Sequence, residues 1–193
     1  MEYILTPYSS SFEPYCWWEN AFTHDELNWL QEKAINSKDR AQVGGNPDNE
    51  NLMKIRRSQI SWLSNNETNL WIFKKLAHVV SALNSNFYRF DLSGFGEALQ
   101  LTNYNQSEQG MYGWHQDYNA LVSRKLSVVL QLSDPKDYEG GNLQIMTQEE
   151  PQTVRKQRGL LTVFPSYNLH QVTPVTQGTR QSLVAWISGP DFR

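Results

Sequence analysis

From residue 97 onward, short runs of β-forming residues alternate with turn clusters, and this pattern constrains the fold more than any other feature. The runs cover 97–104, 125–132, 142–146, 159–164, 170–175 and 180–187. Clusters such as DPKDYEGG and TQG separate them and are typical of turns. Sequential strands with short turns favour antiparallel pairing, so we expect a two-sheet sandwich or rolled barrel of jelly-roll type.

Two amphipathic segments precede these runs and predict helices. Residues 23–37 begin with Thr23 and Glu26 in the arrangement of a capping box, followed by apolar residues at helical spacing, namely Leu27, Leu30 and Ala34. A second helix is predicted over about 67–87, where one apolar stripe contains Leu70, Phe73, Leu76, Val80, Leu83 and Phe87. The expected fold class is α+β: a double-stranded β-helix (jelly-roll) core of antiparallel strands with N-terminal helices packed on one side.

Length and composition predict one domain over residues 1–193, with a helical part at about 20–90 and a jelly-roll core at about 95–190. The single cysteine, Cys16, cannot form an internal disulfide, and the first residues lack the pattern of a secretion leader, so we expect a cytoplasmic protein. No apolar run approaches the roughly 18 residues of a membrane-spanning helix. The net charge of -3 disfavours a nucleic-acid partner.

Candidate metal ligands occur in GWHQDY, residues 113–118, where one residue separates His115 from Asp117. In an extended strand both side chains point to one face, while the other face carries Trp114, Gln116 and Tyr118. A histidine and an aspartate at this spacing also occur on ordinary polar strands. The interpretation as a metal site therefore depends on a third ligand.

His170, in FPSYNLHQVTPV, is the candidate third ligand. Two imidazoles and one carboxylate form the facial triad, which holds Fe(II) on one face and leaves the remaining positions open. The other histidines have no obvious partner, because His24 lies at a helix start and His78 lies on a helix. We expect those two to be exposed or structural.

Arg180 is the candidate for binding an anionic ligand. It follows His170 by ten residues, so we expect the two to flank one hairpin whose turn spans about Pro174 to Thr179. A guanidinium there can bind a carboxylate through two parallel hydrogen bonds. The alternative is a solvated arginine at the end of a hairpin.

The run HQD, the run from His170 to Arg180 and the following QSLVAWI resemble the 2-oxoglutarate- and Fe(II)-dependent dioxygenases, in detail their prolyl 4-hydroxylase-like branch. LQLTNYNQSEQGMYGWHQDY is similar to the family's strand that carries two tyrosines, here Tyr104 and Tyr112. RKLSVVLQLSDPKDYEGGNLQI resembles its next strand, turn and Gly-Gly hairpin, and RRSQISW at 56–62 resembles its R-x-S-x-x-x-W segment beside the peptide groove. The resemblance covers roughly residues 20–190.

This resemblance implies that His115, Asp117 and His170 hold Fe(II), and that Arg180, aided by Tyr104, binds the far carboxylate of 2-oxoglutarate. It also implies hydroxylation with consumption of O2, release of succinate and CO2, and L-ascorbate as a reductant. Collagen-type members carry a lysine at the position of Arg180, and either cation can hold the carboxylate. Tyr112 stands at odd spacing from His115, so it faces the same way only if Gly113 marks a β-bulge.

The substrate that the resemblance implies is a prolyl residue in a protein or peptide. The candidate substrate-binding residues are Tyr112, Arg56, Ser58 and Trp186. Extended proline-rich segments dock well on aromatic surfaces, which suits Tyr112 and Trp186. Residues 40–54, rich in Gly, Asn, Asp and Pro, predict a long loop that is either a substrate lid or a surface insertion without a role.

Several alternatives stay open. The same oxygenase chemistry can act on another amino-acid side chain, a small metabolite or an alkylated base. A non-catalytic jelly-roll binding module has a structural metal or none, and a zinc hydrolase requires a general base for which the sequence offers no clear candidate. The oligomeric state is also open, a monomer included.

Overall fold

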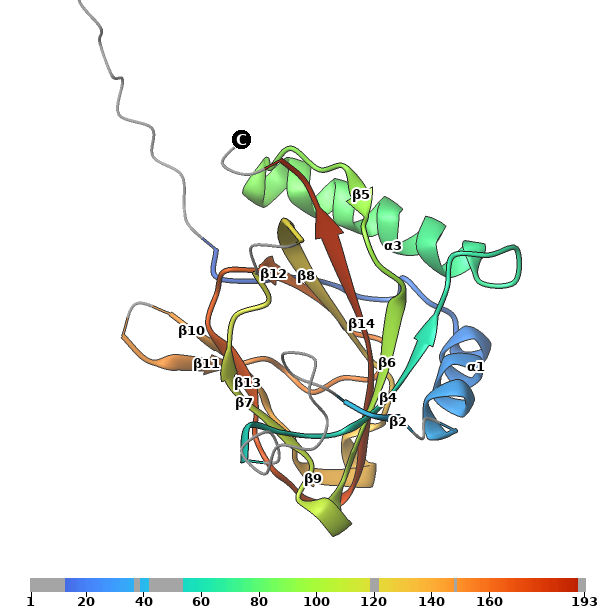
Figure 1. The fold of residues 1–193 in the computed structure, drawn as a ribbon, viewed down its shortest axis with the longest axis vertical. Helices are drawn as coiled ribbons and strands as arrows, with labels where there is room; N and C mark the ends of the chain where they lie inside the picture. Colours follow the sequence, from blue (N-terminus) through green and yellow to red (C-terminus); the bar gives the residue numbers. More distant parts are fainter. Residues whose placement is uncertain (1–12, 37–38, 42–53, 119–121, 148, 191–193) are drawn as a thin grey trace, which may run out of the picture.

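The computed structural model describes residues 13–36, 39–41, 54–118, 122–147 and 149–190. Within these residues two antiparallel β-sheets face each other, and two helices cover the larger sheet on the side away from the smaller one (Figure 1). The helices are α1 (His24–Ile35) and α3 (Leu70–Leu83), and a π-helical segment, Asn84–Tyr88, continues α3. The predicted double-stranded β-helix with helices on one side is confirmed.

The larger sheet has nine strands. Seven follow the order β1-β12-β8-β14-β6-β4-β2, and β5 and β9 also pair with β14. In chain order these strands are β1 (Cys16–Trp18), β2 (Asp39–Arg40), β4 (Gln59–Leu63), β5 (Gly94–Phe95), β6 (Leu99–Asn105), β8 (Arg124–Gln131), β9 (Tyr138–Gly140), β12 (Leu161–Pro165) and β14 (Val175–Ser188).

The smaller sheet has five strands in the order β11-β10-β13-β7-β3. They are β3 (Arg56–Arg57), β7 (Met111–His115), β10 (Leu143–Met146), β11 (Pro151–Thr153) and β13 (His170–Val172). The runs of β-forming residues identified in the sequence overlap β6, β8, β10, β12, β13 and β14, which divide between the two sheets. Residues 20–90, expected to form the helical part, also contain β2, β3 and β4. The runs therefore predicted the main strands of the core, but not these additional strands or the distribution over two sheets.

The first helix begins as its capping box predicts. The Thr23 side chain accepts a hydrogen bond from the Glu26 backbone N–H, and the Glu26 carboxylate accepts one from the Thr23 N–H. These bonds satisfy backbone donors that have no partner inside the helix. The predicted apolar positions Leu27, Leu30 and Ala34 are buried against the sheet.

The apolar stripe of α3 is shorter than predicted. Its four central members are buried, but Leu70 is 38% exposed and Phe87 is 47% exposed. Leu70 is the first residue of the helix, and Phe87 lies in the π-helical segment. The wider π-helical turn changes the angle between successive side chains, so Phe87 leaves the buried face.

The predicted hairpin between His170 and Arg180 is wrong. β13 pairs with β7 and β10 in the smaller sheet, whereas β14 pairs with β6 and β8 in the larger one. Residues 175–179, predicted as a turn, belong to β14 and pair partly with β9. A side chain at Gly178 would overlap the Asp137 carbonyl oxygen, so this glycine allows a close approach of β9 instead of making a turn.

Part of the predicted loop falls outside the described residues. Arg40, at its start, belongs to β2, and residues 42–53 are not described, so the lid hypothesis stays a prediction. Over the described ranges, no helix has both the length and the apolar character needed to cross a membrane.

Candidate active site

A cavity of about 810 Å³ between the sheets brings together most of the predicted site residues. Its lining includes Arg56, Tyr104, Tyr112, His115, Asp117, His170, Arg180 and Trp186. Ser58, the remaining predicted residue, is buried and accepts a hydrogen bond from Arg56 Nε. His24 and His78 are exposed, as expected.

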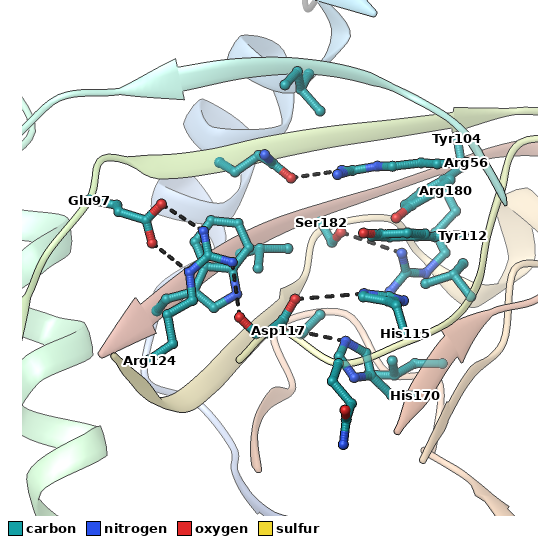
Figure 2. Close-up of a pocket in the computed structure, with 18 of the residues that line it drawn as sticks. Arg56, Glu97, Tyr104, Tyr112, His115, Asp117, Arg124, His170, Arg180 and Ser182 are labelled. Carbon is teal, nitrogen blue, oxygen red and sulfur yellow. Dashed lines mark hydrogen bonds and ion pairs between the residues drawn. The ribbon is translucent and has the colours of Figure 1, made fainter. Parts of the chain in front are cut away.

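The candidate metal ligands converge at one point of this cavity. One ligand atom from each of His115, Asp117 and His170 lies within 4.8 Å of the other two (Figure 2). The histidines pair directly across β7 and β13. Asp117 lies beyond the end of β7, and its backbone N–H donates to the Ser166 carbonyl at 2.9 Å.

Strand alternation alone does not produce this convergence, because β7 ends at His115. Gln116, predicted to face away, lines the cavity as well. Trp114 and Tyr118, expected on the strand face opposite His115, are 38% and 41% exposed. The bend held by the Ser166 carbonyl, rather than a continued strand, therefore directs Asp117 toward the histidines.

Backbone carbonyls set the tautomer of both histidines. Nδ1 of His115 lies 2.8 Å from the Gly113 carbonyl oxygen, and Nδ1 of His170 lies 2.9 Å from that of Asn168. A carbonyl can only accept, so Nδ1 carries the proton and Nε2 keeps its lone pair. Both Nε2 atoms face the Asp117 carboxylate, at 3.6 Å from His115 and 3.4 Å from His170.

The protonation states suit a divalent cation. Burial, together with the neighbouring His170, lowers the pKa of His115 to about 4. Burial also acts to raise the pKa of Asp117, but His170, His115 and the Ser127 hydroxyl outweigh it and hold this pKa below its ordinary value. A neutral His115 and a charged carboxylate at pH 7 are the metal-binding forms of these groups, and the donor set is that of the facial triad.

The predicted β-bulge before His115 is present. Opposite β13, the register shifts between the pairs His170–His115 and Val172–Tyr112, so β7 has one extra residue there. As a result Tyr112 and His115 both line the cavity despite their odd spacing. Their rings are stacked, with centroids 3.4 Å apart and planes inclined by 14°.

Arg180 places a buried positive charge in the same cavity. Its side chain is 2% exposed, its guanidinium lies 5.4 Å from the Tyr104 ring centroid, and Nη1 donates to Ser182 Oγ at 3.4 Å. Among the described residues no ion pair joins Arg180 to a carboxylate. Burying an unpaired charge is costly, so the site fits an anionic ligand.

Several residues of the site escaped the sequence analysis. Arg124 makes two 2.6 Å hydrogen bonds to Glu97, donates to the Asp117 carbonyl at 3.3 Å and lies 4.0 Å from the Trp186 ring centroid (Figure 2). These contacts connect the bend at Asp117 to the larger sheet, and no sequence motif near Arg124 or Glu97 indicates them. Ser127 was also missed, although a polar residue inside an apolar run is a signal that could have identified it.

Sequence comparison identifies a family and relatives that are similar to this chain. Residues 99–188 match the family described as the 2OG-Fe(II) oxygenase superfamily. A PKHD-type hydroxylase of Shewanella sp. strain MR-7 is 30% identical over 185 residues, which cover 87% of this chain and 75% of that protein. A PKHD-type hydroxylase of Prochlorococcus marinus is 43% identical over 88 residues, 44% of this chain, and the match spans only 39% of that relative's length.

Solved structures share the fold at low sequence identity. A Trichoplax adhaerens prolyl hydroxylase, in complex with a hypoxia inducible factor peptide fragment, has a TM-score of 0.73 at 19% identity and covers 91% of this chain and 84% of its own. A Pseudomonas putida prolyl-4-hydroxylase has a TM-score of 0.72 at 22% identity, with 91% and 92% covered. The match to the Shewanella hydroxylase, at 30% identity over 75% of that protein, shows that this chain belongs to the 2OG-Fe(II) oxygenase superfamily, whose chemistry uses Fe(II), 2-oxoglutarate and O2.

Proposed function

We propose that this chain, as one domain over residues 1–193, hydroxylates a prolyl residue in a protein or peptide, consuming O2 and releasing succinate and CO2. The observation that carries the proposal is one cavity that holds both a His-Asp-His donor set and a buried Arg180 without a carboxylate partner among the described residues. The prolyl substrate is supported by the names of the proteins that share the fold. L-ascorbate as reductant and a cytoplasmic location are further predictions, the latter from the lone Cys16.

In this proposal the metal ligands are Nε2 of His115, Nε2 of His170 and the Asp117 carboxylate. Bound Fe(II), with 2-oxoglutarate and O2, supplies the oxidising chemistry. The Gly113 and Asn168 carbonyls hold the two imidazoles in the ligating tautomer. The Ser127 hydroxyl donates to Asp117 Oδ2 at 2.6 Å and fixes the carboxylate from behind.

The far carboxylate of 2-oxoglutarate is assigned to Arg180, aided by Tyr104. Both side chains are almost fully buried, so a charge-assisted bond there is not weakened by water. Arg180 also borders a second, smaller pocket, which Tyr138 lines as well. The Tyr138 hydroxyl is held there, because it accepts a hydrogen bond from Gln131 Nε2 at 2.8 Å.

The substrate is assigned to the part of the cavity near Trp186. Trp62 and Trp186 lie 6.3 Å apart between ring centroids and are inclined by 43°, and both line the cavity. Aromatic walls of this kind bind proline rings and extended peptides well. Tyr112, Arg56 and Ser58 complete the predicted set, with Arg56 and Tyr112 in the cavity lining and Ser58 bonded to Arg56.

The test is to load the metal-free protein with Fe(II) anaerobically, admit O2 with 2-oxoglutarate and a proline-rich peptide library, and look by mass spectrometry for one added oxygen atom. Oxidation confined to non-prolyl residues would overturn the prolyl substrate and keep the oxygenase. Consumption of 2-oxoglutarate without peptide oxidation would favour a small metabolite. Absence of any metal-dependent 2-oxoglutarate consumption would favour a binding module.

A further inference from the structure

We propose that Arg56 and Tyr112 form a positioning stack that holds the His115 imidazole in place for metal binding, in addition to any contact with substrate. The inference rests on the proposed function, because it takes His115 as a metal ligand. The proposed role belongs to the face of the Tyr112 ring, and it is distinct from a contact between the Tyr112 hydroxyl and a peptide.

The stack has three layers. The Tyr112 ring lies nearly parallel to the His115 imidazole, with 3.4 Å between centroids, and the Arg56 guanidinium carbon lies 4.5 Å from the Tyr112 centroid. Figure 2 shows Arg56, Tyr112 and His115 one above another. The layers come from two paired strands, since Arg56 on β3 is directly opposite Tyr112 on β7. The β-bulge brings Tyr112 over His115.

The outer layer is itself held firmly. Arg56 is 9% exposed, donates from Nε to Ser58 Oγ at 2.9 Å and donates from Nη2 to Gln100 Oε1 at 2.8 Å. Gln100 in turn accepts from the Thr102 hydroxyl at 3.3 Å. These acceptors are neutral, and among the described residues no ion pair joins Arg56 to a carboxylate. The attraction between a desolvated cation and an aromatic face then keeps Tyr112 in place.

His115 needs such support more than His170 does. Each imidazole has one in-plane hydrogen bond to a carbonyl, and a single bond of this kind restrains the position of the ring but not its tilt. The His170 side chain is 6% exposed and packs against Phe164, with 4.7 Å between ring centroids and the ring planes inclined by 63°. His115 is 14% exposed, and the Tyr112 face restrains its tilt.

The test compares two substitutions at Tyr112. Tyr112→Leu removes the ring, whereas Tyr112→Phe removes only the hydroxyl. The measurement is an anaerobic titration of the metal-free protein with Co²⁺, without 2-oxoglutarate or peptide, followed by visible absorption. We expect Tyr112→Leu and Arg56→Met to lose roughly 10-fold or more in Co²⁺ affinity, as residues that orient a metal ligand usually do, and Tyr112→Phe to keep the wild-type affinity.

Trp114→Leu is the matched control, because Trp114 is the neighbour of His115 on β7 but does not line the cavity. It should leave Co²⁺ affinity unchanged. Equal affinity of wild type and Tyr112→Leu would overturn the stack while leaving the metal site intact, and so would an equal loss in the Phe and Leu variants. A wild-type protein that binds no Co²⁺ would instead overturn the proposed function. Thermal unfolding of each metal-free variant verifies that it folds, and Arg56→Met decides if the Leu variant does not.

Discussion

The two faces of the larger sheet differ sharply although the same strands build both. Along β14, Leu183, Ala185 and Ile187 belong to the core under the helices, while Arg180, Ser182, Val184 and Trp186 line the cavity. Along β8, Leu126, Val128 and Leu130 face the helices, while Ser127 bonds to Asp117 and Val129 lines the cavity. Because successive residues of a strand point to opposite faces, the same strands supply core residues on one face and cavity residues on the other.

The outer face of the larger sheet, toward the helices, is mainly apolar, whereas the inner face, toward the cavity, carries a buried charge. Leu130 and Leu183 are fully buried among apolar neighbours on the outer face. On the inner face, Trp186 Nε1 is buried without an acceptor among the described residues, and Arg180 has no carboxylate there. Buried polar groups without partners cost free energy that a bound ligand recovers. Substitutions on the inner face should therefore mainly lower activity, whereas substitutions on the outer face should mainly lower the free energy of unfolding.

The largest expected effect is on the inner face and concerns activity alone. Replacing His115 or Asp117 by Ala should reduce metal-dependent 2-oxoglutarate consumption to background, because the facial triad loses a ligand. Consumption at the wild-type level by either variant would rule out the assigned metal centre. Denaturant unfolding should show that both variants still fold, since the core under the helices is untouched.

On the outer face, Leu130→Ala should lower the free energy of unfolding by about 2–5 kcal/mol, because it leaves a cavity in a packed core. Urea denaturation measures this loss. The KM for 2-oxoglutarate, measured where the variant is fully folded, should stay at the wild-type value. A changed KM together with unchanged stability would contradict the separation of the two faces.

The pH dependence of stability should come from the inner face. Because the pKa of His115 is about 4 in the folded protein and 6.5 in the reference state, the unfolded chain binds an extra proton between these values. The metal-free protein should therefore lose stability on the order of 3 kcal/mol as the pH falls from about 6.5 to 4. Denaturation of His115→Gln across this range is the comparison, and an equally steep slope there would refute the assignment.

The smallest of these effects concerns the cosubstrate. Arg180→Ala should raise the KM for 2-oxoglutarate by roughly 10-fold to 100-fold, equivalent to about 1.5–3 kcal/mol for hydrogen bonds to a charged group. Arg180→Lys should retain part of the affinity, since it keeps the charge but loses the two-pronged geometry. Steady-state assays at saturating metal measure both. If Arg180→Ala keeps the wild-type KM, another residue binds the far carboxylate.

Much of the fold and of the site was predictable from local patterns. The β-forming runs after residue 97 predicted β6, β8, β10, β12, β13 and β14, and the capping box at Thr23 predicted where α1 begins. The donor set was found because few residue types bind metals, and the chain has only four histidines. The resemblance placed Tyr112 at the site, and its odd spacing from His115 meant that this required a β-bulge, which is present. Except for His170, which is distant in sequence from the other two ligands, each of these signals lies within a few residues of the feature that it predicts.

The predictions were wrong where one local sequence pattern is compatible with two structures. TQG is typical of a turn, but Gly178 serves a close contact between β9 and β14 inside a continuous strand. The predicted alternation after His115 failed because the strand ends there and the Ser166 carbonyl redirects the chain. In both cases the residues that decide the outcome are distant in sequence, so a local pattern does not contain them.

The sequence by itself determined which chemical groups the protein has and, through their periodicity, which strand face most of them share. Only the tertiary structure decided which of them meet: Arg124 with Trp186, Arg180 with Tyr104, and Arg56 with Tyr112 over His115. These contacts depend on the pairing of strands and on the distance between two sheets. Such quantities arise from the packing of the whole chain, so no short stretch of residues encodes them.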